Sequence, residues 1–511
     1  MATDYAAVFR EDLKEFHKMT KQFYNKEISV AQYKGFSGGF GSYAQRGGTA
    51  SMLRLRLAGG EVTKDTLKFL ADCIEKYHID LIHLTTCQSI QFHNLSAMQV
   101  CNLIEEAFDF GIITRGGGGD YPRNVMCSPL SGVQVNESFD VLPYAKEAAD
   151  YLLSFINKVT LPRKLKVCFS NNHENMTHAS FRDLGFIANK NKTFDVYSAG
   201  GLGRNPRMGV KVAEQVEPNK ILYYIKAMIL TFLEYGNYQN RATARTRYMQ
   251  ETLGKEGYVK AYQKHLAQVL DFQDLDLTIT PDSIIKTGIG VLEHPRAIMQ
   301  KQSGLYSVSY HPIGGNPKPD FFQHLYELIL PMEDVRMRIT PEEGIYLINL
   351  TPNEARQVLA LTEDGAKTLF ETSVACIGAS ICQVGIGDSM HLLETCIAQV
   401  REENFPDLVL PKIHISGCPS SCSAHQIGAL GFRGGVKQTS HGPKPAFAVF
   451  HQGCPFLGKE HFGEELGVMP QDEIPTFLVE LGHAVMAAKI DYDSFITRYY
   501  DTFLKIVKKY I

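Results

Sequence analysis

Two short stretches near the C-terminal end say most about how this chain must fold: Cys376-Ile-Gly-Ala-Ser-Ile-Cys382 and Gly417-Cys-Pro-Ser-Ser-Cys422. Four thiols in two tight pairs supply one ligand for each iron of a [4Fe-4S] cluster. The C-x5-C spacing of the first pair is wider than the C-x2-C to C-x4-C spacing usual in structural zinc sites. The sequence therefore predicts Cys376, Cys382, Cys418 and Cys422 as iron ligands, set among small residues that let backbone amides approach a bulky cluster.

Size and composition are those of an ordinary globular protein with several domains. The chain has 511 residues, of which 44% are hydrophobic and 21% charged, and its formal net charge is -3. This balance gives no polybasic signal for nucleic acid or an anionic membrane surface. We see no signal-peptide pattern and no apolar run of the roughly 18 residues that a membrane span needs. The odd number of cysteines, 11, argues against a disulfide framework, so a cytoplasmic location is expected.

An internal repeat organises much of the remaining chain. The matching residues stand at one constant offset and are Gly59-Gly60 with Gly314-Gly315, Thr85 with Thr340, and Asn94-Leu-Ser96 with Asn349-Leu-Thr351. In each copy an alternating strand and a Gly-Gly turn precede a helix, two short strands and a closing helix capped by Ser96 or Thr351. Each copy is therefore a β-α-β-β-α unit of ferredoxin-like character. A short sheet covered on one face closes its core poorly, so the two copies are expected to pack together.

The elements of the repeat can be placed along the chain. The first copy is predicted to have strands at 52–57, 81–84 and 90–93 and a helix at 64–76. The second copy is predicted to have strands at 306–310, 335–339 and 345–348 and a helix at 320–329.

The cysteine pairs resemble the signature of the siroheme and [4Fe-4S] sulfite and nitrite reductases, C-x5-C followed by G-C-P-x-x-C. The resemblance implies that all four cysteines bind the cluster and that Cys422 also bridges to the siroheme iron. It implies an α+β fold in which duplicated ferredoxin-like half-domains form one pseudo-symmetric domain beside two α/β siroheme and cluster domains. The expected units are an N-terminal arm at 1–48, half-domains at 49–111 and 301–365, a siroheme and substrate domain at 112–300, and a cluster domain at 366–511.

Three basic segments are candidates for holding a small oxyanion, which needs several fixed cations at one point. They are Met52-Leu-Arg-Leu-Arg-Leu-Ala-Gly-Gly60, Pro122-Arg-Asn-Val125 and Leu161-Pro-Arg-Lys-Leu-Lys166. Each is similar to a segment of the family, and the resemblance implies that Arg54, Arg123, Lys164 and Lys166 contact the substrate. The second copy has Ser309 and His311 where the first has Arg54 and Arg56, an asymmetry that a single active site would leave.

Siroheme is rich in carboxylates, so its pocket needs many donors. The stretch Leu84-Thr-Thr-Cys-Gln-Ser-Ile-Gln-Phe-His93 also resembles a family segment. The resemblance assigns cofactor contacts to Gln88, Gln91, His93, Asn124, Arg163, Cys422 and Arg245, the last on an expected helix. Two positions depart from the family pattern, because Cys87 stands in the place of an arginine and His83 in another often basic place. Candidates to compensate are Arg115, Arg204, Arg207 and Arg247.

The resemblance implies an oxidoreductase that reduces sulfite to sulfide, nitrite to ammonia, or both, by six electrons. We find no flavin or nicotinamide motif and no second cluster motif, so a separate donor, ferredoxin or a reductase subunit, is expected. The basic segments lie slightly closer to the sulfite branch.

Three other functions stay open at this point. One is an enzyme like precorrin-3B synthase, which resembles this family and keeps a similar cluster motif. Another is a non-catalytic iron–sulfur electron carrier, which the departures at Cys87 and His83 favour. The third is a binding protein with a structural zinc site formed by Cys418, Cys422 and His425.

Overall fold

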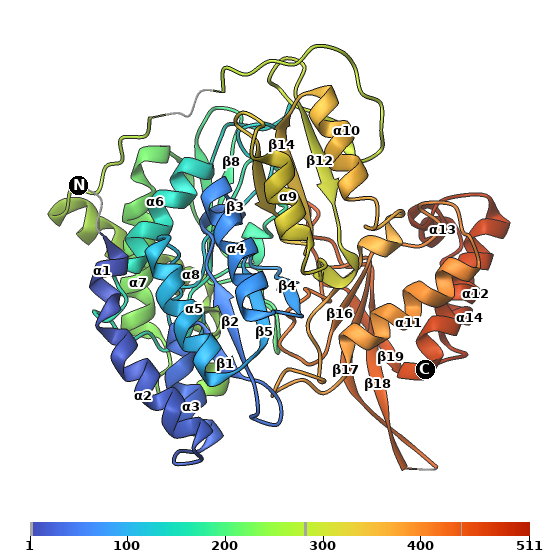
Figure 1. Cartoon of the computed structure of the whole chain (residues 1–511). Coiled ribbons are helices and arrows are strands. Elements are labelled where there is room, and N and C mark those ends of the chain that lie inside the picture. Colours follow the sequence, from blue (N-terminus) through green and yellow to red (C-terminus); the bar gives the residue numbers. More distant parts are fainter. Residues whose placement is uncertain (1–3, 281–283, 441) are drawn as a thin grey trace.

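The computed structural model describes residues 4–280, 284–440 and 442–511, and these residues form four β-sheets (Figure 1). Two of the sheets belong to the repeated half-domains. The other two belong to the α/β segments that follow each half-domain along the chain. The N-terminal helices and the C-terminal helices lie at opposite sides of the molecule in this view.

The first half-domain is an antiparallel sheet in the order β1-β2-β5-β4. Its elements are β1 (Ser42–Ala44), β2 (Ser51–Leu55), α4 (Lys64–Tyr77), β4 (Ile82–Leu84), β5 (Ile90–Leu95) and α5 (Ala97–Asp109). Helix α4 begins where Thr63 caps the backbone of Thr66 and buries its apolar stripe, including Leu67, Leu70 and Ile74.

The second half-domain repeats this arrangement in a sheet of order β11-β12-β14-β13-β3. Its elements are β11 (Ala297–Met299), β12 (Tyr306–Tyr310), α9 (Phe321–Ile329), β13 (Arg336–Ile339), β14 (Ile345–Leu350) and α10 (Pro352–Leu361). Helices α4 and α9 pack against each other, and buried residues of both copies form one continuous hydrophobic core. The predicted pseudo-symmetric domain is therefore confirmed.

Equivalent residues of the two copies share unusual backbone conformations. The φ angles are 63° and 61° at Gly59 and Gly314, 71° and 70° at Gly60 and Gly315, and 59° and 64° at Asn94 and Asn349. Left-handed backbone is natural for glycine and tolerated by asparagine, which explains why these residue types match between copies. The predicted caps are also confirmed, because Ser96 and Thr351 each form a capping box at the start of α5 and α10.

One strand crosses between the copies. β3 (Glu61–Val62) follows the Gly-Gly turn of the first copy but pairs with β13 of the second. Glu61 forms ion pairs with Arg336 (3.0 Å), with Arg338 (2.9 Å) and with Lys146. Burial acts to raise the pKa of Glu61, but the three cations outweigh it and lower the pKa to about 2. Glu61 therefore stays charged and ties both half-domains to the neighbouring α/β domain.

The two α/β sheets also share one topology, which extends the duplication over most of the chain. In both, the first two strand pairs are parallel and the last two antiparallel. One sheet contains β6 (Met126–Cys127), β7 (Val167–Ser170), β8 (Leu184–Ala188), β9 (Phe194–Ser198) and β10 (Val210–Val216). The other contains β15 (Val374–Ala375), β16 (Ile413–Ser416), β17 (Leu430–Thr439), β18 (Gly442–His451) and β19 (Glu464–Pro470).

Each α/β sheet packs against its own helices around a separate core. The helices of the first domain are α6 (Leu142–Leu153), α7 (Ile221–Tyr235) and α8 (Met249–Phe272). Those of the second are α11 (Ser389–Glu402), α12 (Ile474–Ala488), α13 (Tyr492–Arg498) and α14 (Tyr500–Val507).

The N-terminal segment is helical and docked on the first half-domain. Its helices are α1 (Tyr5–Arg10), α2 (Asp12–Tyr24) and α3 (Val30–Ser37), and α2 packs against α5. Arg115 anchors it through Asp12 (3.0 Å) and the carbonyl of Gly39 (2.7 Å). Residues 1–3 of the predicted arm and 281–283 and 441 of the predicted α/β domains lie outside the described residues.

Two sheet edges differ from the units expected from sequence. β1 falls within the predicted arm and β11 within the predicted siroheme domain, yet each pairs with a half-domain strand. Both strands have three residues, too few to show an alternating pattern. The half-domain sheets therefore begin earlier than the repeat in the sequence indicates.

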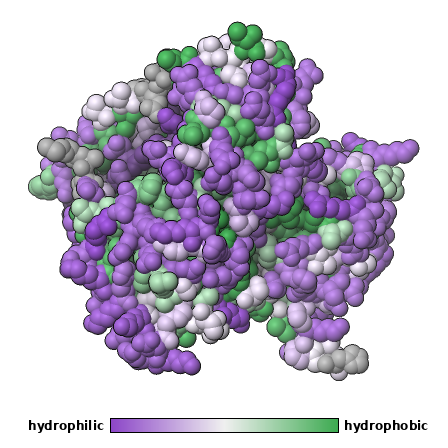
Figure 2. Space-filling model, in the orientation of Figure 1, coloured by the Kyte–Doolittle hydropathy of each residue, from purple (hydrophilic) through white to green (hydrophobic). Residues whose placement is uncertain are grey.

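The face shown in Figure 2 is mainly hydrophilic, with hydrophobic residues in smaller areas between. Among the described residues, no helix combines the length and apolar character needed to pass through a membrane.

The Gly-Gly turn yields a prediction with a matched control. Gly60 and Gly111 have the same φ of 71°, but a Cβ on Gly60 would lie 2.7 Å from the Ile339 carbonyl, whereas one on Gly111 would meet nothing within 4 Å. Gly111→Ala should cost about 1 kcal/mol for the left-handed backbone alone. Gly60→Ala should cost roughly 1–3 kcal/mol more because of overpacking. Urea unfolding midpoints test this, and equal losses would show that the turn is not tightly packed.

Candidate functional site

The strand topology brings one cysteine of each pair, Cys376 and Cys418, to the same sheet edge. Cys376 and Cys418 lie just beyond the carboxyl ends of β15 and β16, which are parallel neighbours and so end at the same edge of the sheet. The N–H of Gly417, next to Cys418, donates to Sγ of Cys376 at 3.2 Å, and the Ser389 hydroxyl lies 3.2 Å from the same sulfur. Donors aimed at a sulfur favour its thiolate form, which is the form that binds metal.

The loop 378–387 carries Cys382 and packs against the segment of the second pair. Its backbone is held against the second pair by the N–H groups of Ile386 and Gly387, which both donate to the carbonyl of Gly417 at 2.8 Å. A Cβ on Gly417 would lie 2.6 Å from the Gly387 carbonyl. The small residues around the cysteines therefore permit a close approach of two loops.

Two of the thiols, Cys376 and Cys422, have raised pKa values to which neighbouring thiols contribute. Cys422 is an exposed residue, yet desolvation by the protein atoms around its thiol raises the pKa to about 12, with further contributions from the charges of Cys376 and Cys418. Burial likewise raises the pKa of Cys376, and Cys418 adds to this. Like charges that raise one another's pKa lie close together, so this group is well suited to a cation that would accept all the thiolates.

In the described part of the chain, no three His, Cys, Asp or Glu side chains converge on one position for a single metal ion. A cube instead spreads its thiolates over separate irons. The zinc alternative required Cys418, Cys422 and His425 to converge. The His425 ring packs on Phe450 with its centroid 5.0 Å away. Within the same described part, the geometry gives no support to a zinc site.

The equivalent loop of the first copy has the same shape without cysteines. There the N–H of Asn171 donates to Oγ of Ser128 at 3.0 Å, just beyond β7 and β6. This bond is the counterpart of the one from Gly417 to Cys376. The loop geometry is thus a property of the duplicated sheet, and only the second copy carries sulfur.

Two of the four predicted substrate cations share an acceptor. Arg54, in β2, and Arg123, before β6, both donate to the carbonyl of Gly117, at 2.6 and 2.8 Å. Arg123 also donates to the carbonyl of Gly119 at 2.8 Å. Both side chains are half-buried, and both guanidinium groups keep further N–H donors. The glycine run therefore holds the two arginines in place and leaves donors available for a ligand.

Lys164 and Lys166 join the same electrostatic group. Burial and the charges of Arg245, Lys166 and Arg123 lower the pKa of Lys164 well below its ordinary value. Burial also lowers the pKa of Lys166, and so does Arg245. Burial, with Arg54 and Arg245, lowers the pKa of Arg123 to about 10, which leaves it charged at neutral pH. Cys422 interacts electrostatically with both lysines, so these cations and this cysteine border one space.

Several buried donors around this space have no protein partner among the residues that the structure describes. They are Arg123 Nε, Arg245 Nε, Arg247 Nη1 and His178 Nδ1. A buried donor left unpaired costs roughly 1–3 kcal/mol, so a ligand rich in acceptors is expected. A small cavity beside His178 is lined in part by Thr86, Arg182, Glu342, His414 and Cys422. The unpaired arginine donors suit the carboxylates of a siroheme.

Gln91 and His93 support Arg54. With the Gln91 amide oriented so that its oxygen faces the guanidinium, this oxygen accepts from Arg54 Nε (3.0 Å) and Nη2 (2.5 Å). The amide nitrogen then donates to His93 Nε2 at 3.1 Å. Burial lowers the pKa of His93 to about 3, so it is the neutral acceptor that this chain of bonds needs. The cofactor contacts that the resemblance implies for Gln91 and His93 stay a prediction.

The side chains of Gln88 and Asn124 form hydrogen bonds with the protein backbone. The Gln88 amide donates to the carbonyls of Cys127 (2.8 Å) and Ile339 (2.7 Å) and accepts from the Cys127 N–H (2.8 Å). Asn124 donates to the carbonyls of Leu57 (2.8 Å) and Cys87 (2.9 Å). These bonds favour a structural role over the cofactor contact that the resemblance implies for both residues.

Arg163 and Arg245 are each paired with a carboxylate. Arg163 contacts Asp120 at 2.5 Å and Arg245 contacts Asp183 at 2.9 Å. The expected helix around Arg245 is wrong, because this residue has extended backbone between two short 3-10 turns. Asn240 caps the first turn through the N–H of Ala242, and α8 starts only at Met249.

Sequence reasoning missed Arg182 as a neighbour of Cys87. Burial raises the pKa of Cys87, but Lys166, Arg182 and Arg54 outweigh it and lower the pKa to about 6. Arg182 and His178 stand in no basic motif, so no local pattern could have shown them. Two of the arginines expected to compensate for Cys87 and His83 have carboxylate partners of their own. Arg115 pairs with Asp12 of the N-terminal segment, and Arg207 pairs with Glu251 at 2.8 Å.

The other departure, His83, is buried and contacts Asn316 through Nδ1 at 2.9 Å. Burial lowers its pKa to about 4, so it is neutral at physiological pH.

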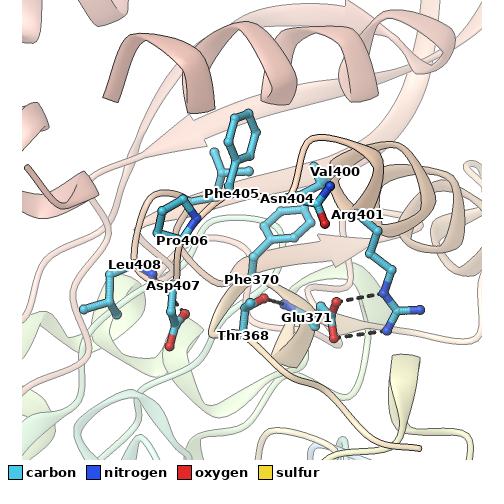
Figure 3. A pocket seen from close by; sticks show the side chains of 11 residues that line it. Thr368, Phe370, Glu371, Val400, Arg401, Asn404, Phe405, Pro406, Asp407 and Leu408 are labelled. Atoms are coloured by element: carbon cyan, nitrogen blue, oxygen red, sulfur yellow. Dashed lines mark hydrogen bonds and ion pairs between the residues drawn. The ribbon is translucent and has the colours of Figure 1, made fainter. Parts of the chain in front are cut away.

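A separate pocket of about 220 Å³ lies in the C-terminal domain and is drawn in Figure 3. Its charged side chains are already paired. Glu371 accepts from Arg401 at 2.7 and 3.1 Å, and Asp407 accepts from the N–H groups of Leu369 (2.7 Å) and Leu408 (2.9 Å). It holds none of the predicted site residues.

The lowered pKa of Cys87 gives a pH prediction for protein made without siroheme. Because the anionic thiol is the nucleophile, alkylation of Cys87 by iodoacetamide should be half-maximal near pH 6 and full above it. Lys166→Met removes one stabilising charge and should move the midpoint to higher pH. Mass spectrometry of the Cys87 peptide gives the measurement, with Cys87→Ser as the blank. A midpoint at the ordinary thiol value in the unmodified chain would contradict the cationic surroundings.

Comparisons with known proteins agree with this site. A family model described as the nitrite and sulphite reductase 4Fe-4S domain matches residues 118–270, and one described as the nitrite/sulfite reductase ferredoxin-like half domain matches residues 43–107. The chloroplastic ferredoxin–nitrite reductase of Betula pendula is 27% identical over 78% of this chain and 70% of its own length. The ferredoxin sulfite reductase of Mycobacterium tuberculosis is 23% identical over 76% of this chain and 71% of its own length.

The solved structure of the Mycobacterium tuberculosis NirA protein shares the fold, with a TM-score of 0.77, 22% identity, and coverage of 92% of this chain and 89% of that one. In its cysteine signature, its duplicated half-domains and these matches, the chain is similar to the nitrite and sulfite reductases.

Proposed function

We propose that this protein reduces sulfite, nitrite or both, by six electrons, at a siroheme coupled to a [4Fe-4S] cluster. The observation that carries the proposal is the convergence of Arg54, Arg123, Lys164 and Lys166 beside Cys422, a residue of the cluster signature. A group of like charges in a protein interior repels itself and is stabilised by an anion.

The cofactors and the protein have different tasks in this proposal. When bound, the cluster and siroheme supply the electrons and an iron position for the anion, with Cys376, Cys382, Cys418 and Cys422 as the cluster ligands. The unpaired donors of Arg123, Arg245, Arg247 and His178 would receive the siroheme carboxylates. The Thr86 hydroxyl donates to the carbonyl of Cys422 at 2.7 Å and so fixes the backbone of a residue that would hold the cluster beside the siroheme.

The arginines orient the anion. Arg54 is immobilised by Gly117 on one side and Gln91 on the other, and Arg123 by Gly117 and Gly119. Guanidinium groups held in this way keep planar pairs of N–H donors in fixed directions, which suits the oxygens of a small oxyanion. No rearrangement of these side chains is then needed on binding.

The lysines hold charge and supply protons. Each oxygen that leaves the substrate as water needs protons, and an ammonium group with a lowered pKa releases its proton more readily. Lys164 and Lys166 have this property because burial and neighbouring cations disfavour their charged forms. Arg54 and Arg123 cannot serve in this way, because a guanidinium keeps its proton.

The electron donor is proposed to be ferredoxin, since similar reductases from Betula pendula and Mycobacterium tuberculosis carry ferredoxin in their names. All 11 cysteines are free in the structure, which suits the proposed cytoplasmic location. Both nitrite and sulfite reductases are among the similar proteins, so the relative kcat/KM for the two anions is the measurement that assigns the substrate.

A direct test joins spectroscopy and turnover. Protein produced with siroheme available should show siroheme absorption bands together with iron and labile sulfide, and should oxidise reduced methyl viologen when sulfite or nitrite is added. Siroheme bands without turnover would contradict the reductase activity. Cluster absorption without siroheme bands would instead indicate an electron carrier.

Removal of one substrate arginine should lower kcat/KM while both cofactors stay bound. Arg123→Ala removes a charged donor worth roughly 1.5–3 kcal/mol, so a loss of about ten- to a hundredfold is expected. Arg123→Lys keeps the charge and should recover part of the loss. Arg498→Ala, at an exposed position at the end of α13, is the control and should leave the rate unchanged. A normal rate in Arg123→Ala with full siroheme content would remove Arg123 from the site.

The lowered pKa values of Lys164 and Lys166 predict how kcat/KM changes at alkaline pH. Their charged forms are present below their lowered pKa values, so kcat/KM should fall as pH rises through them. Replacement by arginine keeps the charge to much higher pH. Lys164→Arg or Lys166→Arg should therefore lower the maximum rate but move the alkaline fall to higher pH. If neither substitution moves it, the fall belongs to another group.

A further inference from the structure

The loop 378–387 is the irregular part of the cluster signature. It carries Cys382 between β15 and α11 and lies outside any helix or strand. Within the loop the N–H of Cys382 donates to the carbonyl of Gly378 (2.9 Å) and that of Gly385 to the carbonyl of Cys382 (3.2 Å). Two further bonds attach its end to Gly417. The middle of the loop, where Cys382 stands, needs support from elsewhere.

That support comes from the opposite end of the chain. Arg46 lies in the turn between β1 and β2 of the first half-domain, which Figure 1 shows in blue, reaching toward the C-terminal domain. Its backbone N–H donates to the carbonyl of Ile381 at 2.8 Å. Its Nη2 donates to the carbonyls of Cys382 (3.1 Å) and Gly385 (2.7 Å). One residue thus binds three carbonyls of the loop.

The turn that presents Arg46 is itself fixed. The N–H of Gln45 donates to the carbonyl of Ala50 at 2.8 Å and closes the turn. The Gln45 side chain exchanges two hydrogen bonds with Asn94, accepting from its N–H at 2.6 Å and donating to its side-chain oxygen at 3.0 Å. Asn94 belongs to β5 of the same sheet. The position of Arg46 is therefore set by the half-domain sheet and not by the loop that it contacts.

We propose that Arg46 is a positioning residue for the cluster. It holds the backbone of the 378–387 loop so that Cys382 faces the other three thiols, and it brings a permanent positive charge to the carbonyl of a cluster ligand. Reduction adds one negative charge to a cluster, so a nearby cation favours the reduced form and raises the reduction potential. A residue of the first half-domain thereby influences the reduction potential of the cluster. This inference rests on the cluster of the proposed function.

Three substitutions separate the two roles of Arg46 in the holoenzyme. Arg46→Ala removes the side-chain bonds and the charge, Arg46→Gln removes the charge but keeps N–H donors, and Arg46→Lys keeps the charge but loses the fork that spans two carbonyls. Arg356→Ala is the matched control. Arg356 is also exposed and also donates to a backbone carbonyl, that of Val291 (3.4 Å), but in the second half-domain.

The readouts are cluster properties and do not depend on turnover. They are iron and labile sulfide per chain, the rate of iron release to a chelator, and the reduction potential from a titration followed by electron paramagnetic resonance. Arg46→Ala should release iron severalfold faster and have a lower potential than the unmodified enzyme. Arg46→Gln should lower the potential with the smaller change in release rate, and Arg46→Lys should show the reverse. Arg356→Ala should change neither.

The outcomes distinguish this inference from the proposed function. An unmodified enzyme without iron and sulfide would overturn both. An unmodified enzyme with its cluster, and Arg46→Ala with the same potential and release rate, would overturn the inference alone. If Arg46→Ala cannot be purified with a cluster, the Gln and Lys variants decide: unchanged potential in Arg46→Gln together with unchanged release in Arg46→Lys would also overturn it.

Discussion

The rest of the structure depends on the mutual repulsion of a few half-buried cations. The charges of Arg54 and Arg245 help to lower the pKa of Arg123, and those of Arg245, Lys166 and Arg123 help to lower the pKa of Lys164. Such a group is tolerable only where the backbone fixes each member and a negatively charged ligand completes the arrangement. The glycine run at 116–119 provides part of that backbone, because its carbonyls hold both arginines without side chains in the way.

Duplication explains how one chain supplies both the cations and the cysteines. Both halves place loops at the ends of parallel strands β6 and β7 or β15 and β16, and both use the same N–H to side-chain bond there. In one half the acceptor is the oxygen of Ser128, and in the other it is the sulfur of Cys376. Cations stand in the first half and thiols in the second, so the two chemistries meet where the halves face each other.

The sequence predicted the features that rest on local chemistry. The repeat was visible because left-handed positions demand Gly or Asn, as at Gly59, Gly314, Asn94 and Asn349. The caps Ser96 and Thr351 were visible because a capping box has a fixed spacing. The edge strands β1 and β11 were not, because three residues carry no period.

Features that depend on distant partners could not be read in advance. The role of Arg182 beside Cys87 comes from the packing of separate loops, and the turn containing Arg46 meets the cluster loop only in the folded chain. Gln88 and Asn124 show the opposite limit: the family resemblance predicts cofactor contacts for them, but their amide groups bind the protein backbone.

The strand β3 has a consequence for any attempt to divide this molecule. It is encoded with the first half but completes the sheet of the second, where it shields β13 and carries the carboxylate that neutralises Arg338. A gene split after α8 would yield a C-terminal fragment with a bare sheet edge and an unmatched interior charge, open to pairing with other chains. The two halves are therefore interdependent parts of one folding unit, which explains why they remain in a single polypeptide despite their similar architecture.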